Sequence, residues 1–342
     1  MTPMTPLRRL AVMTATPTDP AIAEAAARLR AGGLVAFPTE TVYGLGANAL
    51  DPEAVAAIYA AKGRPPTNPL IVHAADPEGL RGVVAAWPAE AERLAEAFWP
   101  GPLTLVLPRA DGLPPGVSAG LPAVGVRVPA HPVARALLAA AAVPVAAPSA
   151  NPYMGLSPTQ ADHVASGLSG APHDVLLLDG GAAEVGLEST VLDLTGACPR
   201  ILRPGGLSAA ALRAVLGRVE VLAPGVHEGA LPSPGLAARH YAPRARLRLW
   251  GLGGRALAEA GREVAASGAR VGVLGLSPAP AGAHALRWVE MPAEPAGYAQ
   301  RLYATLHTLD AEGLTDILVE APPATEAWAA VSDRLSRAAA PA

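Results

Sequence analysis

Lysine and asparagine are nearly absent from this chain. Its 342 residues include 26 lysines and arginines, yet the only lysine is Lys62 and the only asparagines are Asn48, Asn68 and Asn151. The excess of Ala, Pro, Gly and Arg indicates a coding bias that replaces Lys and thins out Asn wherever either can be spared. Lysine is a compact point charge and arginine a planar fork, so we expect Lys62 where arginine cannot serve. Chance survival of a surface lysine is the alternative, and we favour the functional interpretation because Asn48 and Asn68 lie in the same stretch.

Other scarcities exclude whole classes of site. The single cysteine, Cys198, rules out an intrachain disulfide and a cysteine metal cluster, and we expect it to be an ordinary loop or strand-edge residue. A formal net charge of −3 gives no global field that would attract nucleic acid or an anionic membrane, so an anion must be held by a local basic pocket. The P-loop, HExxH and protein-kinase signatures are all missing.

Long apolar runs are missing as well. The longest, residues 136–147, is interrupted by Pro144 and is too short to span a bilayer. Arg8 and Arg9 precede an apolar run too short and broken to be an export signal. We therefore expect a soluble cytoplasmic protein without a membrane partner. With 51% apolar residues the chain can build a core, and its length allows two domains.

The most informative stretch is residues 34–73. An apolar run predicts a buried strand that ends at Pro38, and a turn rich in hydroxyls and glycine follows at residues 39–46. Asp51 then predicts a helix N-cap, and Gly63 predicts its end. The stretch thus gathers hydroxyls, a lysine, an arginine, an asparagine and a histidine in one neighbourhood.

The rest of the first 216 residues mixes strands and helices irregularly, which predicts a twisted mixed α/β sheet. The expected strands are 34–37, 70–72, 103–107, 124–128, 144–147, 175–179, 190–193 and a last one near 201–203; helices are expected at 21–31 and 52–62, after Asp76-Pro77, Pro88 and His131-Pro132, after a cap at Ser157–Thr159, and after Ser208.

Residues 217–244 form a long connection punctuated by proline and glycine. Structureless connections beyond about 12–15 residues are usually functional or linkers. This one ends in Arg239-His240-Tyr241, so we expect it to serve as linker and lid, with Tyr241 against a nucleotide. The organisation that we predict is a catalytic domain at 10–216, the linker or lid at 217–244, and a smaller Rossmann-like domain at 245–342.

Residues 251–256 in that second domain resemble a dinucleotide-binding fingerprint. The next predicted strand ends at Gly275 without an Asp or Glu to hold a ribose, so we interpret the glycines as a packing turn.

Polar side chains scattered at predicted strand ends form the candidate site. Several basic groups with hydroxyls suit an anionic ligand with many oxygens, such as a nucleoside triphosphate. From its apolar strand alone, Arg127 is better explained by a protein carboxylate partner than by a ligand carboxylate. The candidates are Thr39, Thr41, Lys62, Arg64, Asn68, His73, Arg127, Ser149, Asn151, Ser157, Ser189 and Arg203.

Seven motifs occur in a specific order: PTETVYGLGANA, KGRPPTNPLIVH, WPGPLTLVL, VRVPAHP, APSAN, ESTV and LRPG. Together they resemble the YrdC/Sua5 family of threonylcarbamoyl-AMP synthases. The later SPGLAARHYAP resembles the linker of the long, two-domain Sua5 type. The resemblance is strong over residues 18–243.

The resemblance implies a nucleotidyltransferase that joins L-threonine, bicarbonate and ATP into L-threonylcarbamoyl-AMP, releasing pyrophosphate. The product would pass to separate proteins that install t6A at tRNA position 37, with no stable nucleic-acid binding by this chain. The family's KxR element would be Lys62 and Arg64, which we expect to be catalytic. ATP-binding positions would be Arg64, Asn68, Ala147, Ser149, Asn151, Ser157, Arg203 and Tyr241; threonine-binding positions would be Thr41, His73, Arg127 and Ser189. No protein-borne metal cage is expected, and Mg²⁺ would arrive with ATP.

Two other functions are less consistent with the sequence. A double-stranded-RNA-binding protein is disfavoured by the net charge and the lack of a basic run. A carbamoyltransferase of the hydrogenase-maturation type would need zinc-finger parts, which a single cysteine excludes.

Overall fold

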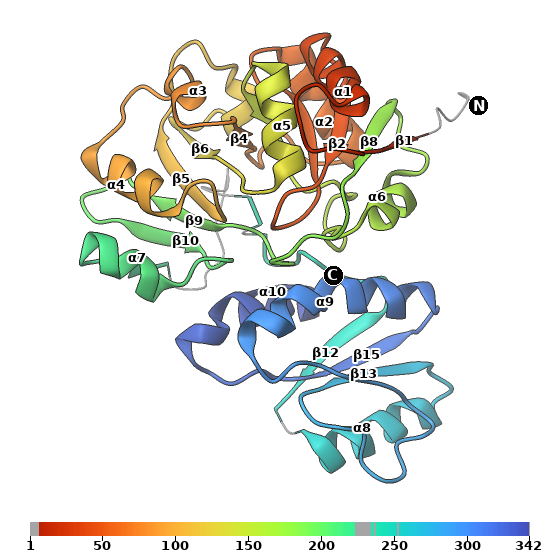
Figure 1. Ribbon diagram of the computed structural model, residues 1–342. Helices are drawn as coiled ribbons and strands as arrows, with labels where there is room; N and C mark the ends of the chain where they lie inside the picture. The colour runs from red at the N-terminus through yellow and green to blue at the C-terminus, as the bar shows by residue number, and fades with distance from the viewer. Residues whose placement is uncertain (1–6, 223–233, 236, 252, 342) are drawn as a thin grey trace. The chain divides into compact units, whose positions relative to one another are not determined.

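The computed structural model describes residues 7–222, 234–235, 237–251 and 253–341 (Figure 1). It consists of two compact units. The first comprises residues 1–153 and 157–237, and the second comprises 154–156 and 238–342. Part of the expected lid, residues 223–233 and 236, lies outside the described part of the chain, so both the lid and the proposed domain limits stay predictions.

The first unit is a mixed α/β structure, as expected. Its elements are β1 (Arg8–Ala11), α1 (Pro20–Arg30), β2 (Leu34–Phe37), β3 (Gly44–Asn48), α2 (Pro52–Lys62), β4 (Ile71–His73), α3 (Glu78–Arg81), α4 (Ala89–Phe98), β5 (Leu103–Pro108), the 3-10 turn η1 (Pro115–Ser118), β6 (Ala123–Arg127), α5 (Pro132–Ala141), β7 (Val145–Ala146), α6 (Ala161–Leu168), β8 (Val175–Asp179), β9 (Thr190–Asp193), β10 (Arg200–Arg203), α7 (Ala209–Leu216) and β11 (Glu220–Val221).

The strands of this unit form one sheet in the order β1-β8-β2-β3-β7-β4-β6-β5-β9-β10-β11. The sheet contains both parallel pairs, such as β2 with β8 and β4 with β6, and antiparallel pairs, such as β2 with β3 and β5 with β6. The prediction of a twisted mixed sheet is therefore confirmed.

The two faces of the sheet carry separate apolar cores, and β2 shows why. Leu34 and Ala36 point into the core that also contains residues of α2 and α4, whereas Val35 and Phe37 point into the core shared with α1 and α5. This alternation is the period of two that a strand imposes on its side chains. All four residues are buried, so the continuous apolar run correctly indicated a strand covered on both faces.

Helix α2 begins and ends where its sequence predicts. The carboxylate of Asp51 accepts the backbone N–H groups of Glu53 and Ala54, and Gly63 closes the helix in the left-handed conformation. The last residue of α2 is Lys62, which is thereby fixed at the edge of the candidate site.

Strand β3 was missed in the sequence because its glycines look like a turn. A Cβ on Gly46 would lie 2.8 Å from side-chain atoms of both Phe37 and Val145, so glycine is required for the neighbouring side chains to close over this strand. A second departure concerns Ser157, which does not cap α6. The N-cap of that helix is Gln160, and the Ser157 hydroxyl donates to Glu188 instead.

Two short strands were also missed. Arg8 and Arg9 lie in β1, which pairs with β8, and Arg9 forms ion pairs with Asp162 and Asp179. The connection predicted to begin at Gly217 contains β11, which pairs with β10.

The second unit is a smaller parallel α/β structure. Its sheet has the order β12-β15-β13-β14 with every pair parallel, and helix α8 lies on the opposite face from α9 and α10 (Figure 1). Its elements are β12 (Arg246–Trp250), α8 (Gly254–Ala266), β13 (Val271–Gly275), β14 (Arg287–Glu290), α9 (Pro295–Ala311), β15 (Asp316–Glu320), the 3-10 turn η2 (Glu326–Trp328) and α10 (Ala329–Ala339). A smaller second α/β unit was predicted, and this confirms it.

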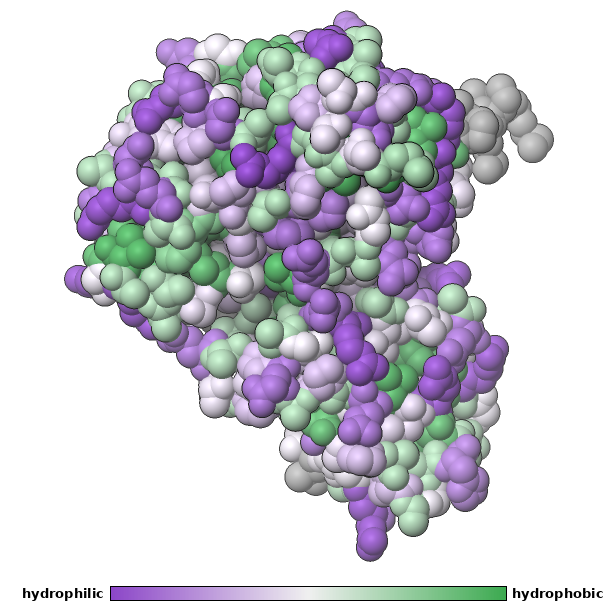
Figure 2. Space-filling model, viewed as in Figure 1, coloured by the Kyte–Doolittle hydropathy of each residue, from purple (hydrophilic) through white to green (hydrophobic). Residues whose placement is uncertain are grey.

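Hydrophilic and hydrophobic residues are interspersed over short distances on the face drawn in Figure 2. No helix among the described residues is long and apolar enough to cross a membrane.

Gly205 offers a test of close packing beside β9. A Cβ there would lie 2.3–2.4 Å from backbone atoms of Glu188, Ser189 and Thr190, which cannot rotate away. We expect Gly205→Ala to lower the free energy of unfolding by about 3 kcal/mol or more, at the upper end of overpacking effects. Urea unfolding measures this. The control is Gly112→Ala, where an added Cβ meets nothing within 4 Å, and equal stability of both variants would contradict the packing argument.

Candidate functional site

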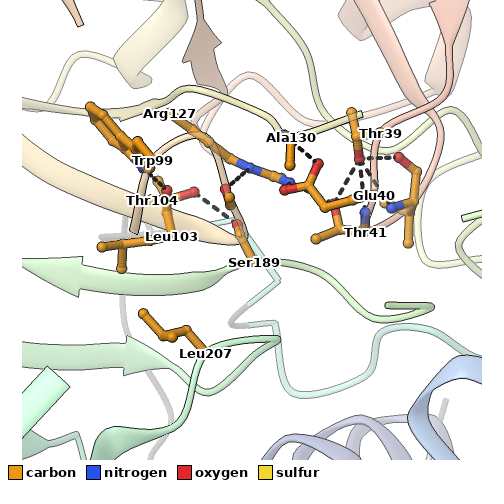
Figure 3. Close-up of polar contacts among 12 residues, drawn as sticks. Thr39, Glu40, Thr41, Trp99, Leu103, Thr104, Arg127, Ala130, Ser189 and Leu207 are labelled. Atoms are coloured by element: carbon orange, nitrogen blue, oxygen red, sulfur yellow. Dashed lines mark hydrogen bonds and ion pairs between the residues drawn. The ribbon is translucent and has the colours of Figure 1, made fainter. Parts of the chain in front are cut away.

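The centre of the candidate site is an ion pair between Arg127 and Glu40. Arg127 is the last residue of β6, and Glu40 lies in the turn after β2. The Arg127 Nη2 atom is 2.7 Å from Glu40 Oε1, and the two side chains are only 5% and 6% exposed. Figure 3 shows the guanidinium directed at the carboxylate. The charge in this apolar strand is thus compensated within the protein, the explanation that the residue pattern alone had favoured.

Neighbouring groups complete this pair. Arg127 Nη1 donates to the hydroxyl of Thr41 at 3.0 Å, and Nε donates to the carbonyl of Gly101 at 3.1 Å. The second carboxylate oxygen of Glu40 accepts the backbone N–H of Ala130 at 3.0 Å. Burial opposes ionisation of Glu40, but the charge and hydrogen bond of Arg127 outweigh it, so the pKa of Glu40 lies below its ordinary value.

His73 lies beside Arg127 because β4 and β6 are parallel with these two residues in register. Burial, followed by the charge of Arg127, lowers the pKa of His73 to about 3. Its imidazole is therefore neutral at physiological pH. The Nδ1 atom of His73 is buried and makes no hydrogen bond to the described residues.

A second polar group surrounds Ser189, just before β9. Its hydroxyl lies 2.8 Å from that of Thr104 on β5 (Figure 3), and Arg203 at the end of β10 donates to its carbonyl at 2.9 Å and to its hydroxyl at 3.2 Å. The preceding residue, Glu188, accepts the hydroxyl of Ser157. Ser189 is a predicted threonine-binding position, and Ser157 and Arg203 are predicted ATP-binding positions. Contacts therefore connect predicted positions for the two substrates here.

A third group joins the end of α2 to the segment after β7. The ammonium of Lys62 donates to the backbone carbonyls of Ser149, at 2.6 Å, and Asn151. Burial, with a smaller contribution from the charge of Arg64, lowers the pKa of Lys62 well below its ordinary value. The lone lysine is thus 4% exposed, which rules out the alternative of a surface lysine retained by chance.

Arg64 and Asn68 form a compact loop of their own. The guanidinium donates to the side-chain oxygen of Asn68 at 2.7 Å and to the carbonyl of Pro69 at 2.8 Å. Ala147, just after β7, donates its N–H to the carbonyl of Ile71 on β4 at 2.9 Å.

Tyr241 lies in the second unit and is 1% exposed. Its ring contacts those of His240 and Tyr303, with the Arg334 guanidinium 4.9 Å from its centre. Tyr241 adopts φ = 59°, a left-handed conformation that is costly for a residue with a Cβ, so these contacts must hold it in place. Its expected contact with ATP stays a prediction.

Comparison with known proteins identifies the family. A family model described as "Telomere recombination" matches residues 27–205, and one described as "Threonylcarbamoyl-AMP synthase, C-terminal domain" matches 207–340. A threonylcarbamoyl-AMP synthase of Bacillus subtilis is 43% identical over 94% of this chain and 93% of its own length. The chain belongs to the Sua5/YrdC family.

Other members agree over comparable lengths. A threonylcarbamoyl-AMP synthase of Schizosaccharomyces pombe is 37% identical over 89% of this chain and 84% of its own. The crystal structure of Pyrococcus abyssi Sua5 complexed with L-threonine is 38% identical and superposes with a TM-score of 0.88, covering 98% of each chain. The two family models confirm the two-domain Sua5 type.

Within this Sua5/YrdC member, contacts connect most of the predicted site residues in small sets. These sets are Thr41 with Arg127 and His73, Lys62 with Ser149 and Asn151, Arg64 with Asn68, and Ser189 with Arg203. Their roles toward ATP and threonine stay predictions.

Sequence reasoning overlooked two buried carboxylates of the site, Glu40 and Glu188. Glu40 occurs in the motif PTETVYGLGANA but is not among the candidate residues, although it is the sole acid in the turn that carries Thr39 and Thr41. A buried arginine needs an acidic partner, so this turn was the place to look for one. No three His, Cys, Asp or Glu side chains within the described ranges lie together as potential metal ligands.

His73 gives a test by pH. Its folded pKa of about 3 lies below the unfolded value of about 6.5, so below pH 6.5 only the unfolded state gains this proton and stability falls as pH falls. Between pH 7.5 and 5.0, protonation of His73 in the unfolded state should lower the free energy of unfolding by about 2 kcal/mol, and His73→Gln should lack this loss. Urea unfolding at the two pH values measures the free energy of unfolding of wild type and variant. An equal loss in both proteins would show that His73 is protonated in the folded state.

Proposed function

We propose that this chain makes L-threonylcarbamoyl-AMP from L-threonine, bicarbonate and ATP and releases pyrophosphate. The similarity to curated threonylcarbamoyl-AMP synthases over nearly the whole of both lengths carries this proposal. The buried basic and hydroxyl groups of the first unit support it, because they suit two substrates that bear carboxylate and phosphate oxygens. The relatives do not favour the RNA-binding alternative.

At the threonine end, Arg127 binds the substrate carboxylate. Its guanidinium has five N–H groups, of which three are used in the contacts described above. One N–H on each terminal nitrogen remains for a bidentate bond to a carboxylate. Thr41, Ser189 and neutral His73 supply hydrogen-bonding groups around it, as the motifs imply.

At the nucleotide end, Lys62 and Arg64 face the triphosphate. The carbamate formed from threonine must attack the α-phosphate in line with the leaving pyrophosphate, a step that depends on positioning and charge neutralisation. The residues assigned to ATP contacts are Asn68, Ala147, Ser149, Asn151, Ser157, Arg203 and Tyr241. Mg²⁺ enters as part of the MgATP substrate, keeping several of its waters.

The place of the reaction follows from its product. A mixed anhydride of a carbamate and AMP is reactive toward water, so a second protein must consume it, and we propose the proteins that transfer threonylcarbamoyl to tRNA for t6A formation. The cytoplasmic location expected from the sequence is part of this proposal.

Lys62→Ala tests the nucleotide end. We expect it to reduce threonine-dependent pyrophosphate release at saturating substrates while threonine binding persists, because the lost charge faces the triphosphate. Lys62→Arg should restore the rate only partly, since a planar fork replaces a point charge. Wild-type turnover by Lys62→Ala would disprove the role.

Arg127 tests the threonine end. Arg127→Met combined with Glu40→Gln avoids leaving an unpaired buried carboxylate, and it should weaken threonine binding by about 2–5 kcal/mol, as for loss of a buried charge partner. ATP affinity should change little. Calorimetry measures both ligands, and unchanged threonine binding by the folded double variant would leave Arg127 with a structural role alone.

A further inference from the structure

Glu40 is a buried charge that the reaction as described leaves unused. Its carboxylate accepts hydrogen bonds from Arg127, from the N–H of Ala130 and from its own backbone N–H. A carboxylate has about four lone-pair sites, so Glu40 can still accept a further hydrogen bond. It lies one residue from Thr41, whose hydroxyl also contacts Arg127.

The charge balance of the pair has a consequence for binding. A buried arginine without a partner attracts any carboxylate of the right size. Arg127 with Glu40 is neutral as a pair, and His73 beside it is uncharged, so a simple anion gains little net charge attraction there. A ligand that presents a carboxylate to Arg127 and an ammonium to Glu40 matches both charges.

We propose that Glu40 determines specificity by receiving the amino group of the substrate. It makes the threonine site selective for a zwitterionic amino acid over a hydroxy acid with the same carboxylate and hydroxyl groups. This rests on the proposed function, in which Arg127 holds the threonine carboxylate. Glu40 acts in recognition alone, and the proposal gives it no part in the proton transfer that precedes carbamate formation.

The test compares L-threonine with 3-hydroxybutyrate, which is threonine without its amino group. Calorimetry on the full chain gives the dissociation constant of each. We expect wild type to bind threonine at least about 100-fold more tightly, the scale for a desolvated charge contact. In Glu40→Gln, threonine should bind at least about tenfold more weakly and 3-hydroxybutyrate about tenfold more tightly, because the lost carboxylate no longer offsets Arg127.

Two further variants keep the result interpretable. Glu40→Asp retains the charge and should keep the preference for threonine even if both ligands bind more weakly. Glu92→Gln removes an exposed carboxylate that pairs with Arg81, and it should change the dissociation constant of neither ligand. Should Glu40→Gln fail to fold, loss of the preference in Glu40→Asp, or tight binding of 3-hydroxybutyrate by wild type, overturns the proposal.

The outcomes separate this proposal from the proposed function. If Glu40→Gln weakens both ligands by the same factor, Glu40 only positions Arg127 and the specificity role is wrong. If wild type binds neither ligand and releases no pyrophosphate with threonine, the proposed function itself fails.

Discussion

A buried ion pair is stable only when its remaining hydrogen-bonding groups are also satisfied, and the Arg127–Glu40 pair imposes that demand on the first unit. The carbonyl of Gly101, the hydroxyl of Thr41 and the N–H of Ala130 meet it. Strands β2 and β6, which lead to the two charges, are separated in the sheet by β3, β7 and β4. The pair therefore fixes segments that sheet hydrogen bonds do not join directly, and these segments carry residues that the proposed function assigns to threonine.

Close backbone approach is the second constraint on the same region. Gly46 lets Phe37 and Val145 close over β3, and Gly205 lets its loop lie against the backbone at residues 188–190. Both glycines serve packing beside the polar groups: the segment that carries Ser189 is held by close backbone contacts, and β3, which follows the turn at 39–41, is held by close contacts with side chains. Side chains that must meet small substrates within hydrogen-bonding distance benefit from such support.

The sequence predicted what local physics determines. Asp51 and Gly63 bound α2 correctly, and the apolar run at 34–37 indicated a strand covered on both faces. The sequence could not identify β3, because a glycine needed for close approach of neighbouring side chains looks the same as a glycine needed for a turn. The sequence offered Glu40 as an acid among the candidate residues' neighbours, but it could not pair Glu40 with Arg127, since the two are 87 residues apart in the chain and only the folded sheet brings them together. The motifs named most of the site, but they did not reveal which of its side chains bind one another.

Lys62 shows how composition and geometry explain each other. In a chain that otherwise uses arginine for every positive side chain, this lysine donates to two backbone carbonyls, those of Ser149 and Asn151. Two acceptors converging on one nitrogen suit an ammonium, whose three donors diverge from a single atom, whereas the planar fork of arginine spreads its donors over three nitrogens. In the proposed function, the third donor of Lys62 binds a phosphate oxygen. Burial that lowers the pKa of this amine also increases what the protonated form would gain from a phosphate, because an anion restores the charge balance that desolvation removed. The bias against lysine thus stops where one atom has to tie the segment after β7 to the end of α2 and, in the proposed function, also hold an anion.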